Sequence, residues 1–217
     1  MADVRILGHT GPVSGKDGDE KPIRQGKEAQ VIVDNLHGRY YERASRGHVF
    51  LLSTVVAGLA VPISTTTAPT VLLWNPTSSG KNLVLIRCTM AYVSGTSVAA
   101  AIGLSYITSA GSTLATGANI SALAASTPTN ALIGSGLTSV MRVSAAGTNT
   151  ILATTNWFYT MFGESALIAT TAMNPYGVSH DFEGLVVIPQ GVAVYPNASA
   201  ATGALLSQTF IWEEIEV

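Results

Sequence analysis

The chain has 217 residues, only 11% of them charged, and a formal net charge of −2. A nearly neutral chain gives no electrostatic reason to expect nucleic acid as the main partner. The single cysteine, Cys88, excludes an internal disulfide framework and a cysteine-rich zinc site. The apolar residues around it predict a small core side chain in a reducing compartment.

Residues 1–27 are predicted to form a tether, the first part of an extended N-terminal arm that spans residues 1–47. Charged side chains alternate there with five glycines and two prolines, and apolar periodicity is almost absent. Such a segment cannot bury enough apolar surface to order itself, so we expect it to be disordered or ordered by a partner. We expect no secretory signal, because the stretch after Met1 is polar.

Residues 28–47 are predicted to form a docking segment. Residues 29–33 are a short strand candidate, and the stretch 35–47 is basic with two adjacent tyrosines. Tyrosine supplies contact area and arginine supplies directed hydrogen bonds at protein interfaces, whereas both can also contact RNA. The basic charge is too small to predict nucleic-acid binding, so protein contact is favoured. The candidate partner-interface residues are Arg24, Lys27, Arg39, Tyr40, Tyr41, Arg43 and Arg46.

The body, residues 48–217, is predicted to be all-β. Runs of aliphatic, β-branched and aromatic residues alternate with turn signals such as Asn-Pro, Ser-Gly and Pro-X-Gly. The expected strands are residues 48–56, 70–74, 82–93, 99–107, 139–143, 157–162, 182–188, 192–195 and 208–215. A long loop is expected over residues 113–136, with a short helix at 120–125 as the alternative, and no convincing helix is expected elsewhere. This many short strands predict a two-sheet sandwich.

The most apolar stretch covers residues 49–63. Its length is below the roughly 20 residues that a helix needs to span a bilayer. A buried strand pair is therefore favoured, and no membrane is expected as a partner.

The charged residues are distributed unevenly. Residues 1–50 hold 15 of the 24 charged residues, and the remaining 167 residues hold nine. A free soluble domain normally has about a quarter of its residues charged. Interface cores are depleted in charge, so a body with so few charges is expected where much of its surface meets other protein. The alternative is a stable, neutral, Ser/Thr-rich β protein of an extracellular kind.

No catalytic site, cofactor or metal site is predicted. Ser179, His180 and Asp181 are the only compact set of a nucleophile, a base and an acid. Neighbours on a strand point to opposite faces, so these three cannot form a triad, and a polar loop before a strand is favoured. Asp181 and Glu183 could share a strand face with a cation, but metal-ligand spacing is absent and a solvated face is favoured.

Three tryptophans offer the only candidate platforms for a sugar. Trp74, Trp157 and Trp212 all lie within apolar strand patterns. Core packing is therefore favoured over exposed carbohydrate platforms.

Three segments of the body carry a resemblance to a known family. Residues 72–85 form a strand, an Asn-Pro turn followed by Ser-Gly-Lys, and a long strand. Residues 185–195 form two strands around a Pro-X-Gly turn, and residues 210–215 form a closing strand. Together they resemble the jelly-roll virion proteins of tailed bacteriophages, which include capsid cement (decoration) proteins and head or tail adaptors. The resemblance implies a jelly-roll-like sandwich and a symmetric dimer or trimer bound to the major capsid protein or the tail.

The sequence thus predicts a non-enzymatic structural protein of a virion, made in the cytoplasm of a bacterial host. The favoured hypothesis is a capsid cement protein that binds between major capsid subunits and whose arm is ordered by its neighbours. The alternative is a tail or fibre module that binds a receptor or a carbohydrate. A hydrolase on a β scaffold is a third and weaker hypothesis.

Overall fold

The computed structural model describes residues 8–9, 23–24, 38–63, 69–108, 127–144, 156–164 and 177–217. The chain divides into two compact units, residues 1–42 and residues 43–217. In the first unit, β1 (Gly8–His9) and β2 (Ile23–Arg24) pair in parallel. The short helix α1 (Tyr41–Ser45) begins in the first unit and ends in the second. The strand predicted at residues 29–33 lies outside the described residues.

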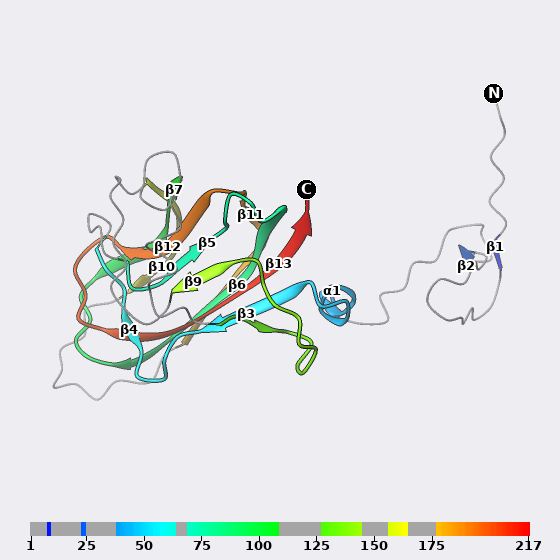
Figure 1. Ribbon diagram of the computed structural model, residues 1–217. Helices are drawn as coiled ribbons and strands as arrows, with labels where there is room; N and C mark the ends of the chain where they lie inside the picture. Colours follow the sequence, from blue (N-terminus) through cyan, green and yellow to red (C-terminus); the bar gives the residue numbers. More distant parts are fainter. Residues whose placement is uncertain are drawn as a thin grey trace, which may run out of the picture. The chain divides into compact units, whose positions relative to one another are not determined.

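The second unit is a sandwich of two antiparallel sheets (Figure 1). One sheet has the strand order β10-β7-β12-β5-β9, and the other has the order β11-β6-β13-β3-β8, with β4 paired to β13. The strands are β3 (Val49–Ser53), β4 (Leu59–Ala60), β5 (Leu72–Trp74), β6 (Lys81–Ser94), β7 (Ala100–Thr108), β8 (Thr129–Asn130), β9 (Arg142–Ser144), β10 (Asn156–Glu164), β11 (Gly177–Ile188), β12 (Val192–Ala198) and β13 (Leu205–Glu216).

Strand β13 lies in the middle of the six-stranded sheet and alternates between its two faces. Its even-numbered residues from Leu206 to Glu214 are buried, whereas the odd-numbered residues are half-buried or exposed. Phe210 and Trp212 belong to the core between the sheets, where the Trp212 ring stacks on Phe50 with centroids 6.4 Å apart. Cys88 is buried in the same core, which confirms the interpretation of this residue as a core side chain.

Strand β5 is buried on both faces. Leu73 packs into the core between the sheets, whereas its neighbours Leu72 and Trp74 belong to a second buried cluster. Because neighbours on a strand point to opposite sides, the five-stranded sheet has apolar residues on both of its faces. This explains why residues 72–74 are continuously apolar instead of alternating.

The Asn-Pro turn and the Pro-X-Gly turn lie side by side. The Asn75 side-chain amide donates to the carbonyl oxygens of Lys81 (2.8 Å) and Ile188 (3.0 Å). The Asn75 backbone N–H donates to Val192, and its carbonyl accepts from Gly191. Asn75 therefore connects β5, β6, β11 and β12, and so joins the two sheets at one end of the sandwich.

The prediction of an all-β, two-sheet sandwich is confirmed, and each of the nine predicted strands overlaps an observed strand. The jelly-roll part of the prediction stays a prediction. Residues 113–126 of the predicted loop, with the alternative helix at 120–125, lie outside the described residues. Within the described part of that loop, residues 129–130 form the short strand β8.

Two local predictions were wrong. The expectation of no helix was wrong for α1. This helix is only five residues long and has no buried residue, so its sequence shows no apolar periodicity that would predict it. The predicted polar loop at Ser179, His180 and Asp181 is instead part of β11, which begins at Gly177. These three residues form backbone pairs with Thr89, Cys88 and Arg87 of β6. This pairing extends β11 beyond the apolar run from which the strand was predicted.

Candidate partner interface

Helix α1 ends at a glycine that the backbone geometry requires. Gly47 has a φ of 77°, the left-handed region in which residues with a Cβ are strained. Its N–H donates to Ala44 (3.0 Å), and the N–H of His48 donates to Arg43 (3.0 Å). This pair of bonds forms the Schellman motif that ends many helices. It turns the chain directly into β3.

The predicted interface residues fall into several places. Lys27 lies outside the described residues, and of Arg24 only the backbone is described, in β2. The Arg39 guanidinium lies over the Tyr40 ring, 5.4 Å from its centroid. This is a cation–π contact between two of the predicted residues. Tyr41, at the start of α1, is more than half exposed.

Arg43 and Arg46 belong to the second unit, and both are exposed. The Nε of Arg43 lies 3.2 Å from an Oε1 of Glu213 on β13. The Glu213 side chain is only 12% exposed, but the Arg43 side chain is 55% exposed and can be solvated without its partner, so the pair contributes only about 0.2–1 kcal/mol. Its effect is to hold the Arg43 side chain in place next to the end of the six-stranded sheet.

A patch that the sequence did not predict lies in the loop after β8. Leu132, Ile133 and Leu137 are exposed, and Ile133 is 88% exposed. We call these three residues the loop patch. The only sequence signal was three large apolar residues around two glycines, Gly134 and Gly136, at the end of a stretch otherwise rich in Ala, Ser and Thr. That composition made the whole stretch resemble an ordinary surface loop.

The start of this loop is attached to the end of α1 by a buried asparagine. The Asn130 side chain donates to the carbonyl of Gly47 (2.7 Å) and accepts from the N–H of Leu132 (2.8 Å). A Cβ at Gly47 would overlap Cδ1 of Leu137. Gly47 therefore lies against the loop patch, and Arg43 and Arg46 are close to it in the chain.

The end of the loop is held by a buried carboxylate. Oε1 of Glu214 accepts from the Ser139 hydroxyl (2.5 Å) and from the N–H of Val140 (3.0 Å). Its Oε2 lies 3.2 Å from Nζ of Lys81 on β6. The Glu214 side chain is fully buried, so these bonds replace its lost hydration.

The loop patch is therefore an apolar surface on a loop fixed at both ends. A group of exposed apolar side chains is typical of protein interfaces, where an apolar centre is surrounded by a polar rim. A surface that is fixed before binding loses less conformational entropy when a partner binds. The arrangement suits contact with another protein.

The candidate hydrolytic residues point apart. Nε2 of His180 lies 3.0 Å from the Tyr159 hydroxyl, and the His180 ring contacts Phe182. Asp181 pairs instead with Arg87 on the neighbouring strand, at 2.5 Å from Nε. Ser179 and Asp181 are exposed while His180 is half-buried, as expected for neighbours on a strand. Among the described residues, no three His, Cys, Asp or Glu side chains lie close enough to hold a metal ion.

Two tryptophans have the predicted core positions. Trp74 and Trp212 are buried, but Trp157 is only half-buried, which corrects the prediction for that residue. The Trp157 ring lies across Gly103 of β7, where any Cβ would overlap it. Its indole N–H donates to the Thr160 hydroxyl (3.1 Å). The lack of a side chain at Gly103 is what lets this ring lie along the sheet.

Comparisons with protein-family models, curated proteins and solved structures find no match to this chain. In the part of the chain that the structure describes, no helix has the length and apolar character to cross a membrane. The function is therefore argued from the residues of the chain itself.

Proposed function

We propose that the chain is a structural protein of a bacteriophage virion, a capsid cement protein that binds between major capsid subunits. The observation that carries the proposal is the loop patch, an exposed apolar surface on a body with very little charge. The body contributes this surface, and the charged N-terminal arm contributes a second contact. Each contact is modest, but simultaneous binding of both increases the overall affinity.

The order of the strands supports the jelly-roll interpretation. A jelly roll has eight strands in two sheets, built from two Greek keys. Leaving out the short strands β4, β8 and β9, eight strands remain, and in chain order they are β3, β5, β6, β7, β10, β11, β12 and β13. Consecutive strands of this series lie in different sheets at every step except from β7 to β10. The four-stranded cores of the two sheets then have the orders β11-β6-β13-β3 and β10-β7-β12-β5.

The charge distribution supports assembly rather than catalysis. Outside residues 1–50 the chain has nine charged residues, and five of these occur in the described ion pairs Arg87–Asp181, Lys81–Glu214 and Arg43–Glu213. Few charges then remain to keep the body dispersed as a free protein. A body in contact with other protein over much of its surface has less need of them.

The test is binding of the full-length chain to capsids assembled without it, measured by co-sedimentation. We expect the wild-type chain to pellet with capsids at saturation, in a fixed ratio to the major capsid protein. We expect Ile133→Asp to weaken this binding at least about tenfold, because a charge would be buried in the centre of the interface. Val56→Asp is the matched control, since Val56 is an apolar side chain, 91% exposed, in the turn after β3.

Two results would overturn the proposal. One is a wild-type chain that does not bind capsids and instead binds tails or a glycan, which would favour the receptor-binding module. The other is equal binding by the Ile133→Asp and Val56→Asp variants, which would exclude the loop patch as the contact.

A further inference from the structure

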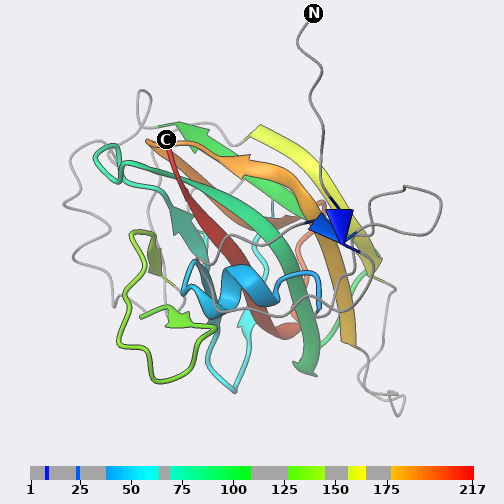
Figure 2. The same cartoon turned by 90° about the vertical axis from the view of Figure 1, so that its right-hand side faces the viewer.

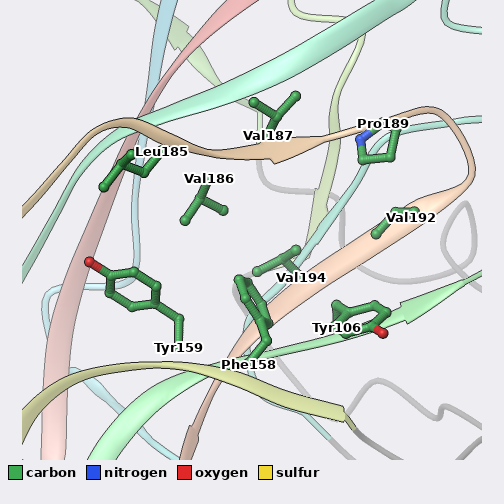
Figure 3. Close-up of a pocket in the computed structure, with 9 residues that line it drawn as sticks. All are labelled: Tyr106, Phe158, Tyr159, Leu185, Val186, Val187, Pro189, Val192 and Val194. Atoms are coloured by element: carbon green, nitrogen blue, oxygen red, sulfur yellow. The ribbon is translucent and has the colours of Figure 1, made fainter.

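We draw no further inference here: the strongest candidate, the apolar pocket of about 380 Å³ (Figure 3) at the edge of the sandwich formed by β10 and β11 (Figure 2), carries nothing because nothing in the structure shows what covers it.

Discussion

The buried carboxylate of Glu214 gives the sharpest test of how the loop patch is held. Replacing it by alanine removes the acceptor of the Ser139 hydroxyl and of the Val140 N–H, and it removes the partner of Lys81. The neighbouring residue Glu213 is the matched control. It has the same side chain on the same strand, but it faces the other way and pairs with the exposed Arg43.

The expected magnitude follows from the burial of each group. Removing one partner of a buried ion pair costs about 3–5 kcal/mol. Lys81 is about a quarter exposed and can regain water, and the Ser139 hydroxyl can rotate, so the lower end of this range applies. The Val140 N–H has no such freedom. We therefore expect Glu214→Ala to lower the free energy of unfolding by about 3 kcal/mol, and Glu213→Ala to lower it by about 0.2–1 kcal/mol.

Thermal unfolding, followed by circular dichroism, measures the difference. For a domain of this size, 1 kcal/mol corresponds to about 2–4 °C in Tm. We expect Tm to fall by about 6–12 °C for Glu214→Ala and by no more than about 4 °C for Glu213→Ala. Hydrogen exchange at the Val140 amide should also become faster in the first variant only. Equal decreases in Tm for both variants would refute the assignment of Glu214 as the anchor of the loop.

Three further predictions concern the rest of the sandwich. Gly47→Ala should lower the free energy of unfolding by about 1–2 kcal/mol in chemical denaturation, because φ is 77° there and the added Cβ overlaps Leu137. Burial raises the pKa of the Cys88 thiol well above its ordinary value, so a thiol reagent should leave the folded chain unmodified and react with one thiol after denaturation; modification at the same rate in both states would contradict this. Asp181→Asn should change the free energy of unfolding by less than about 1 kcal/mol, because its pair with Arg87 is exposed and screened by salt.

The sandwich could be predicted because its strands carry their signals locally. In β13, alternate residues are apolar, and the face that they define is the face that is buried. The Asn-Pro turn and the Pro-X-Gly turn end their strands for reasons that lie within a few residues. Their contact through Asn75 could not be predicted, because it joins residues more than 100 positions apart.

The candidate interface was predicted only in part, because the prediction relied on tyrosine next to arginine and not on exposed apolar residues. Tyrosine next to arginine selected residues 39–46, and the structure places Arg43 and Arg46 in the unit that carries the loop patch. Ile133 was missed because a single apolar residue in a loop looks the same whether it is buried or exposed. Bonds from Asn130 to Gly47 and from Glu214 to Val140 help to keep that loop in place, and both join residues distant in the sequence.

The exposure of Leu185, which is 79% exposed at the edge strand β11, was still harder to predict. Residues 185–188 are a continuous apolar run, which in a regular strand predicts burial on both faces. The left-handed residues Glu183 and Gly184 change this, because they shift the register of β11 and leave Leu185 in solvent. Glycine at position 184 was compatible with such a shift, but a glutamate in the left-handed region carries no sequence signal. An apolar side chain kept in solvent next to a strained backbone costs stability.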